Sequence, residues 1–326
     1  MLNIVFAGTP DFTIPTLDFL VNNHSLIAII TAPPRKQGRK MEVKNSPIFN
    51  YAMLLKKEEK ISESFPIFAP EKLDDDFVFS LSNLKPDLLI SFAYGKIFSK
   101  EFIAIFKKGG INIHPSLLPK LRGPSPVSST ILKGEAESGV SIQTIREKVD
   151  SGEILLQEPF RIEKGETTNM VLSGKVANMS VSLLKKVLDD FDSYLKHAKV
   201  QNESDATYCH LLKKSDGLID WSKEAKEIEC QVNAFSSWPC TYTFCNGKKL
   251  NIIEVHVYNG KKEIELKGTF GAVLGKDLKE GILVETGKGI LCITKLQWET
   301  KKVLMWKDFL NGSSYILSSI FKNVSL

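Results

Sequence analysis

The N-terminal stretch constrains the fold most, because it sets a short apolar run, a tight turn and a helical pattern in that order. Leu2–Ala7 is mostly apolar and ends at Gly8-Thr9-Pro10, and Leu26–Thr31 is a second run of this kind. Between them apolar residues recur at helical spacing, and Thr9 or Asp11 is placed to cap that helix. Two buried strands joined through a turn and a helix form a βαβ unit. The sequence therefore predicts a Rossmann-like α/β domain with a parallel sheet.

The turn after the first strand disfavours the commonest ligand of such a domain, a dinucleotide. It holds a single glycine, Gly8, where the dinucleotide fingerprint needs G-x-G-x-x-G. We therefore expect no NAD or NADP binding. Further strands are predicted at Asp87–Ala93 and Gly139–Ile145, and Ile154–Gln157 is expected to form a hairpin with the second of these.

Two polar side chains interrupt another apolar stretch, Gly109–Pro119, at alternate positions. Asn112 and His114 point to one face of an extended backbone, and Pro115 biases His114 away from helix. Downstream, the residues around Asp150 predict a turn. An amide, an imidazole and a carboxylate can polarise a carbonyl, move a proton and orient the base. A histidine before a proline is more often a packed or capping residue, so these residues alone leave both interpretations open.

The complete pattern resembles the folate-dependent formyltransferase family. The family signature is Asn-x-His, a Ser-Leu-Leu-Pro loop, an Arg-Gly step and then Asp-x-Gly. This chain has the same elements in order: Asn112 and His114, Ser116–Pro119, Arg122-Gly123, and Asp150 with Gly152. The resemblance implies that Asn112, His114 and Asp150 are catalytic. It also implies 10-formyltetrahydrofolate as the formyl donor, an amine as the acceptor and no need for a metal.

A second set of residues resembles the folate pocket of that family. Phe92-Ala93-Tyr94-Gly95 matches a family loop that lines the pocket, although packing at a strand end explains Phe92 equally well. The loop after His114 belongs to the same pocket by resemblance. The implied folate-binding residues are Phe92, Tyr94, Gly95, Ser116, Leu117, Leu118 and Pro119.

Residues 31–44 concentrate positive charge directly after a predicted parallel strand, at the edge where such sheets bind ligands. Five basic residues face one acidic residue, a net +4 in a chain whose total is +5. Proline, glycine and charge predict a mobile surface loop, and an isolated charge run is usually a solvated face. However, Pro33–Arg39 matches the Pro-x-Arg-x-x-Gly-Arg insertion of the family branch that formylates methionyl initiator tRNA. The residues that the resemblance places on the tRNA acceptor arm are Arg35, Lys36, Arg39, Lys40 and Lys44.

The remaining chain predicts a second domain. Thr167–His197 has a long amphipathic helical pattern that closes the first domain, 1–198, and the polar residues 199–207 are interpreted as a linker. From 208 to 326 short strand-like runs recur, with hairpin turns at Asn246-Gly247 and Asn259-Gly260. Five or so short strands predict a small OB-like β-barrel, which the family resemblance also implies, with tRNA as its ligand.

Composition adds few restrictions. The 326 residues are 43% hydrophobic and 25% charged, as in globular proteins. No apolar run approaches the roughly 18 residues of a membrane span, and the start lacks a basic signal-peptide region. We expect a cytoplasmic monomer without membrane association. The five cysteines form no CxxC pair, so we expect reduced core thiols and no zinc site.

Two alternatives remain open. One is a formyltransferase or hydrolase acting on a small molecule, such as an amino-sugar nucleotide or glycinamide ribonucleotide. The basic insertion and the second domain count against it. The other is a non-catalytic RNA-binding module, which the intact Asn112, His114 and Asp150 disfavour. The chain also departs from the family pattern, at Pro124, Ser128 and Ser129 after the Arg-Gly step and at Arg146, Lys148 and Val149 before Asp150.

Overall fold

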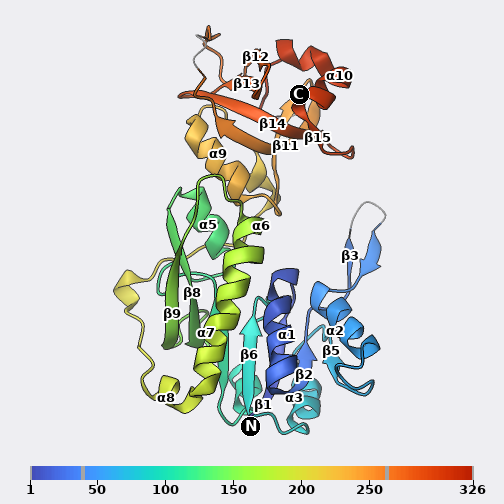
Figure 1. The fold of residues 1–326 in the computed structure, drawn as a ribbon, viewed down its shortest axis with the longest axis vertical. Helices are drawn as coiled ribbons and strands as arrows, with labels where there is room; N and C mark the ends of the chain where they lie inside the picture. The colour runs from blue at the N-terminus through green and yellow to red at the C-terminus, as the bar shows by residue number, and fades with distance from the viewer. Residues whose placement is uncertain (1, 38–40, 261–263, 325–326) are drawn as a thin grey trace. The chain divides into compact units, whose positions relative to one another are not determined.

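The structure is a computed structural model that describes residues 2–37, 41–260 and 264–324 (Figure 1). The chain divides into two compact units. The first contains Met1–Pro126, Ser138–Arg161 and Leu172–His210, and the second contains Val127–Glu137, Ile162–Val171 and Leu211–Leu326. Each unit is built from segments that are not contiguous in sequence, so the division differs in detail from the predicted limits 1–198, 199–207 and 208–326.

The first unit is built on a seven-stranded sheet in the order β5-β2-β1-β6-β7-β8-β9. All pairs from β5 to β7 are parallel, and β7 pairs with β8 in the antiparallel sense. The predicted parallel Rossmann-like sheet is therefore confirmed, with β8 and β9 added beyond β7. The strands are β1 (Asn3–Gly8), β2 (Ser25–Ile30), β5 (Ile67–Phe68), β6 (Leu88–Phe92), β7 (Gly110–His114), β8 (Glu137–Thr144) and β9 (Ile154–Arg161).

Helices cover this sheet because apolar side chains on both of its faces must be buried. Helix α1 lies beside α7 (Figure 1). Leu81 of α3 and Phe102 of α4 join Val5 and Leu89 of the sheet in one buried cluster. The helices of this unit are α1 (Ile14–Asn23), α2 (Pro47–Lys57), α3 (Asp75–Ser82), α4 (Lys100–Ala104), α7 (Ala177–Asp189) and α8 (Phe191–Lys196).

The predicted cap of α1 by Thr9 or Asp11 is wrong. A short 3₁₀ turn, Asp11–Thr13, precedes the helix, and the N-cap residue is Thr13, whose side chain makes no capping bond. Thr9 instead donates its hydroxyl to the carbonyl oxygen of Tyr94 at 3.1 Å. The turn after β1 is thereby bonded to the loop after β6.

The helix predicted over Thr167–His197 is interrupted twice. It consists of α6 (Thr168–Val171), a π-helical turn at Leu172–Val176, α7 and α8. The boundary between the two units falls between Val171 and Leu172, where the π-helical turn begins. Asp190 leaves helical backbone geometry, with φ −145° and ψ 56°, and separates α7 from α8.

The basic segment is a hairpin and not an irregular loop. Strands β3 (Arg35–Gln37) and β4 (Glu42–Lys44) pair in the antiparallel sense, with Arg35 opposite Lys44. Arg35, Lys36 and Lys44 are exposed, as predicted for a surface segment. Arg39 and Lys40 lie outside the described residues. We call residues 35–44 the basic hairpin.

The second unit contains an antiparallel sheet in the order β10-β11-β14-β13-β12, with β15 beside β14. Asn246 and Gly247 have φ of 49° and 71°, and they form the predicted turn between β10 and β11. The strands are β10 (Thr241–Cys245), β11 (Lys248–Val257), β12 (Val273–Asp277), β13 (Gly281–Glu285), β14 (Ile290–Trp298) and β15 (Leu304–Met305). The helices are α5 (Pro126–Leu132), α6, α9 (Ala225–Ala234) and α10 (Trp306–Ser313).

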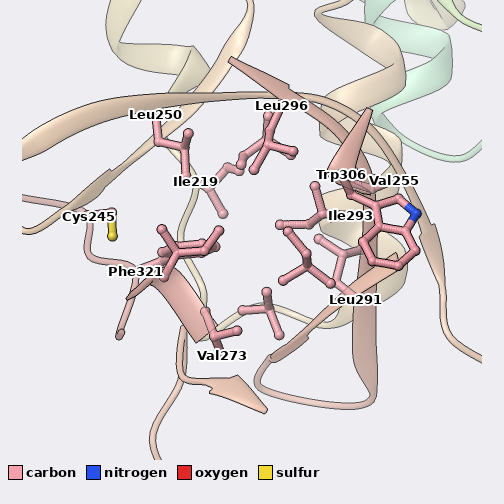
Figure 2. Packing of buried hydrophobic residues seen from close by; sticks show 14 of the residues in the cluster. Ile219, Cys245, Leu250, Val255, Val273, Leu291, Ile293, Leu296, Trp306 and Phe321 are labelled. Carbon is pink, nitrogen blue, oxygen red and sulfur yellow. The ribbon is translucent and has the colours of Figure 1, made fainter. Parts of the chain in front are cut away.

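The C-terminal segment forms hydrogen bonds with residues of β10 and β12, the first and last strands in this order. Phe244 of β10 exchanges two backbone hydrogen bonds with Lys322, each of 2.9 Å. Val273 of β12 donates to Ser319 at 3.0 Å, and Phe321 donates to Gly271 at 2.8 Å. The segment thus closes the sheet around an apolar interior, into which Leu250, Ile293 and Phe321 project (Figure 2). An OB-like closed sheet was the predicted architecture.

Residues 199–207, interpreted from sequence as a linker, are bonded along the first unit. Lys199 and Ile154 exchange two backbone hydrogen bonds of 2.8 Å, and Gln201 is only 7% exposed. We call residues 199–210 the strap. Across the described part of the chain, no helix is long and apolar enough to cross a membrane. The cysteines are free thiols, and four of the five are buried.

Candidate active site

Strand β7 places Asn112 and His114 on the same side of the sheet. The alternate residues of this strand, Ile111 and Ile113, are each 1% exposed, so they are buried in the hydrophobic core. Asn112 lies opposite Gln143 of β8, and His114 lies opposite Ser141. The i, i+2 spacing thus produces the predicted shared face.

Both ring nitrogens of His114 face acceptors. Nε2 lies 2.9 Å from the carbonyl oxygen of Leu121, and Nδ1 lies 3.5 Å from Oδ1 of Asp150. A carbonyl oxygen only accepts, so Nε2 carries a proton. Nδ1 is the ring nitrogen that faces the carboxylate of Asp150. The His114 side chain is 5% exposed, which keeps this arrangement away from bulk water.

Asp150 joins the two residues of β7 from a turn between β8 and β9. Its Oδ1 accepts from Gln143 Nε2 at 2.9 Å and from Asn112 Nδ2 at 3.3 Å, and its Oδ2 accepts from the Gly123 backbone N–H at 2.8 Å. The structure therefore brings together all three predicted catalytic side chains.

The turn that carries Asp150 needs its glycine. Asp150 has φ 54°, a left-handed conformation that few residues with a side chain adopt. A Cβ atom at Gly152 would lie 1.7 Å from the carbonyl oxygen of Thr144, so no larger residue fits there without moving the turn. In the Asp-x-Gly motif, Asp150 thus supplies the carboxylate, and Gly152 allows the close approach of the Thr144 backbone.

Two of the residues that depart from the family pattern, Arg146 and Lys148, are exposed and lie just before this turn. Arg146 donates to Glu153 from Nε at 3.0 Å and from Nη2 at 2.8 Å, and Lys148 Nζ lies 2.6 Å from Glu203. Burial opposes ionisation of Glu153, but hydrogen bonds from Arg146 and Thr144 lower its pKa to about 2. Arg146 and Lys148 therefore supply surface ion pairs, and Asp150 still faces His114.

The predicted folate-binding residues follow two adjacent parallel strands. Phe92, at the end of β6, lies opposite Ile113 of β7, so the loops after both strands leave the same edge of the sheet. Phe92 is fully buried against Phe12, with ring centroids 5.4 Å apart, which supports its packing role. Gly95 is exposed and has φ 85°, a conformation suited to glycine.

Tyr94 has an unusual environment. Its ring stacks on Phe98 at 5.6 Å, and its hydroxyl is buried without a hydrogen-bond partner in the structure. Burial raises the pKa of this phenol to about 12, so the group remains a donor at neutral pH. Most buried hydroxyls have partners, so a ligand atom at this position would satisfy an unmet donor.

The loop 116–119 is fixed by its own hydrogen bonds. Ser116 donates its hydroxyl to Lys120 O at 2.7 Å, and its carbonyl accepts from Ser141 Oγ at 2.7 Å. Leu118 is 3% exposed, whereas Leu117 and Pro119 are half-buried. The Ser116 hydroxyl is thus used within the loop, which leaves Leu117 and Pro119 as the more accessible surfaces.

Sequence reasoning missed the polar residues that support Asp150. The sequence pattern indicates no role for Gln143 or Gln201, and it includes Arg122 only in the Arg-Gly step. Arg122 is 0% exposed, and it donates to Gln201 Oε1 from Nε at 3.1 Å and from Nη2 at 2.9 Å. It also pairs with Glu203 at 2.8 Å, and hydrogen bonds from Arg122 and Lys148 lower the pKa of Glu203 to about 2. The one available signal was the position of Gln143 on the polar side of β8.

One group of potential metal ligands occurs among the described residues, in the second unit. Ligand atoms of His256, Glu280 and Cys292 lie within 4.8 Å of one another. His256 and Glu280 already pair at 3.0 Å, and burial, with nearby carboxylates, raises the pKa of Cys292 to about 12. His256 and Glu280 are thus already paired with each other, and these three residues do not by themselves make a metal site.

Comparison with known proteins gives the chain a family. Residues 2–188 match the formyl transferase family model, and residues 211–314 match the model of the formyl transferase C-terminal domain. The methionyl-tRNA formyltransferase of Treponema denticola is 45% identical over 322 residues, covering 98% of this chain and 100% of that protein.

Two solved structures have a similar fold. HypX from Aquifex aeolicus in complex with tetrahydrofolic acid has a TM-score of 0.62 at 18% identity, over 95% of this chain and 47% of HypX. WlaRD, a sugar 3N-formyl transferase, has a TM-score of 0.62 at 20% identity, over 93% of this chain and 99% of WlaRD. The family matches cover most of both parts of the sequence, and the chain therefore belongs to the formyl transferase family.

Proposed function

We propose that this protein transfers the formyl group of 10-formyltetrahydrofolate to the α-amino group of methionyl initiator tRNA. The observation that supports it most is the convergence of Asn112, His114 and Asp150 at one edge of the sheet. The Treponema denticola relative, which bears the name of this activity, matches the chain over nearly its full length.

The three side chains suit the chemistry of formyl transfer. The amine attacks the formyl carbon, a C–N bond forms and the carbonyl oxygen becomes an oxyanion. The bond to the folate nitrogen then breaks, the amine loses a proton and the folate nitrogen gains one. Asn112 Nδ2 uses one hydrogen in its long, 3.3 Å bond to Asp150 and has a second for the oxyanion.

His114 and Asp150 handle the proton. Nε2 of His114 is held by Leu121 O, so Nδ1 is the nitrogen that takes up and returns the proton. Asp150 Oδ1, 3.5 Å from Nδ1, stabilises the imidazolium that forms. These steps use only side chains of this protein.

The folate donor is proposed to bind in the loops after β6 and β7. The candidate contacts are Phe92, Tyr94, Gly95, Ser116, Leu117, Leu118 and Pro119. Among them Tyr94 offers the unpartnered hydroxyl, and Leu117 and Pro119 offer partly accessible apolar surface. This placement brings a bound formyl group to the edge that carries Asn112.

The acceptor is proposed to bind through its phosphates. The basic hairpin presents Arg35, Lys36 and Lys44 to solvent, and Arg39 and Lys40 add charge in its sequence. Lysine and arginine bind RNA by neutralising phosphates and releasing counterions. The second unit, as an OB-like domain, is proposed to contribute to tRNA binding, and the reaction to take place in the cytoplasm with a monomeric enzyme.

Purified protein, 10-formyltetrahydrofolate and methionyl initiator tRNA test the proposal directly. We expect N-formylmethionine in the alkaline hydrolysate of the tRNA, and little product with methionyl elongator tRNA. An amino-sugar nucleotide and glycinamide ribonucleotide are supplied as competing acceptors. Faster formylation of either small acceptor would reject the tRNA assignment and retain the family chemistry.

A further inference from the structure

The strap runs along the loop that supplies the partners of the active-site side chains. Arg122 N donates to Thr207 O at 2.9 Å, and Cys209 N donates to Arg122 O at 2.8 Å. The Leu121 carbonyl accepts from His114, and the Gly123 N–H donates to Asp150. The strap is therefore paired with the short segment that holds two of the three candidate catalytic residues.

Gln201 is the strap residue that reaches the Asp150 turn. Its Nε2 lies 3.0 Å from the carbonyl oxygen of Asp150 and 2.7 Å from that of Gly152. The same nitrogen lies 3.2 Å from Oε1 of Gln143, whose own Nε2 donates to the Asp150 carboxylate. One buried amide thus contacts both the backbone of the turn and the residue that orients its carboxylate.

Arg122 fixes the direction of this amide. A guanidinium only donates, so the side-chain oxygen of Gln201 faces it and the nitrogen faces the turn. Gln143 is oriented in the same way, because its oxygen accepts from Gly152 N at 3.2 Å and its nitrogen points to Asp150. The hydrogen bonds therefore share one direction: Arg122 donates to Gln201, the amide nitrogen of Gln201 faces the oxygen of Gln143, and Gln143 donates to Asp150.

We propose that Gln201 is a positioning residue that holds the Asp150 carboxylate in place for formyl transfer, with Arg122 fixing the orientation of its amide. The inference rests on the catalytic role proposed above for Asp150. Left-handed backbone such as that of Asp150 persists where surrounding bonds hold it. The amide of Gln201 supplies two such bonds, to the carbonyls of Asp150 and Gly152.

The substitution Gln201→Glu separates positioning from folding. A glutamate has the same length, and its carboxylate accepts from Arg122 as an ion pair. The contact between residue 201 and Arg122 is therefore retained. On the other side an oxygen replaces Nε2 and meets the carbonyl oxygens of Asp150 and Gly152, which must move apart. Displacement of a catalytic group by about 1 Å can cost about 100-fold in rate, so we expect kcat to fall 10- to 100-fold with little change in KM for either substrate.

Gln231→Glu is the matched control. Gln231, in α9 of the second unit, also donates through Nε2 to two backbone carbonyls, those of Asp216 at 2.8 Å and Leu218 at 3.1 Å. Its substitution removes the same kind of bonds at a different place in the chain. We expect it to lower the thermal midpoint while kcat stays at the wild-type value.

Hydrogen exchange gives a readout that does not depend on activity. The Gly152 N–H, which donates to Gln143 in the wild type, should exchange faster in Gln201→Glu and at the wild-type rate in Gln231→Glu. If Gln201→Glu does not fold, Gln201→Met is measured by the same two assays. Wild-type kcat together with wild-type Gly152 exchange in the Gln201 variant would overturn the inference. Wild-type protein that fails to formylate methionyl-tRNA would reject the proposed function, and the exchange data would still decide whether Gln201 holds the turn.

Discussion

The substitution Asp150→Asn tests the central arrangement of the site. The wild-type carboxylate only accepts, and it receives the Gly123 N–H on one oxygen and the Gln143 and Asn112 amides on the other. An asparagine has one accepting oxygen and one NH₂ group. If its oxygen faces Gln143, its NH₂ meets the Gly123 N–H, and if its oxygen faces Gly123, its NH₂ meets two other donors.

At least one donor therefore loses its acceptor in either orientation. An unmatched buried donor costs about 1–3 kcal/mol, and we expect the free energy of unfolding to fall by about 2 kcal/mol. Gln143 cannot relieve the conflict by turning over, because its oxygen accepts from Gly152 N and faces Gln201 Nε2 at 3.2 Å, and both of these nitrogens are donors. Loss of the carboxylate facing Nδ1 of His114 removes the partner of the imidazolium, so kcat should fall by about 10²–10⁴.

Urea unfolding and single-turnover formylation measure the two effects. Asp189→Asn is the control, since Asp189 forms an exposed i,i+4 pair with Lys185 at 2.7 Å, and such pairs contribute about 0.5 kcal/mol or less. A kcat for Asp150→Asn within about threefold of wild type would refute the role assigned to the carboxylate. Equal unfolding free energies for wild type and Asp150→Asn would refute the hydrogen-bond argument separately.

Three further predictions concern single features of the site and its surroundings. Asn112→Ala should lower kcat by about 10²–10³ in a single-turnover assay while the urea midpoint changes little, because Gly123 and Gln143 still donate to Asp150. If the basic hairpin neutralises about four phosphates, log affinity for tRNA should fall with log salt at a slope of about −3. Alanine at four of its five cations, Arg35, Lys36, Arg39 and Lys40, should flatten that slope in filter binding. Unchanged binding would exclude the contact. The pKa of Glu153 is about 2 against an ordinary 4.5, so its stabilising effect is present above pH 4.5 and is lost as the pH falls toward 2. Urea midpoints of wild type and Glu153→Gln should therefore differ at pH 7 and converge near pH 2.

The features predictable from sequence were those that local patterns determine. The βαβ start follows from two apolar runs on either side of a helical period, and the structure confirms it as β1, α1 and β2. The i, i+2 spacing of Asn112 and His114 predicted their common face, because strand geometry leaves no other arrangement. The turn at Asn246-Gly247 was also predictable from a local pattern, because both residues tolerate the positive φ that a two-residue hairpin turn requires.

Other features depend on tertiary contacts that no local pattern reports. Threonine often caps helices, but the hydroxyl of Thr9 instead donates to the carbonyl of Tyr94, which lies in a loop 85 residues away. Thr167–His197 has a continuous helical period, and yet the chain passes between two units inside it. The basic segment has the composition of a loop, and cross-strand backbone bonds that require no apolar side chain make it a hairpin.

The strap shows most clearly why polar composition is ambiguous. A polar residue is exposed in a linker, but a polar residue with every hydrogen-bonding group satisfied can be buried at little cost. Gln201 belongs to the second class, because Arg122 satisfies its oxygen and the Asp150 turn satisfies its nitrogen. The partners lie roughly 50 to 80 residues away in sequence, so no window around Gln201 could reveal them. Since the same bonds hold the turn of the carboxylate proposed to act on His114, we propose that this segment, interpreted from sequence as a linker, is part of the support of the candidate active site.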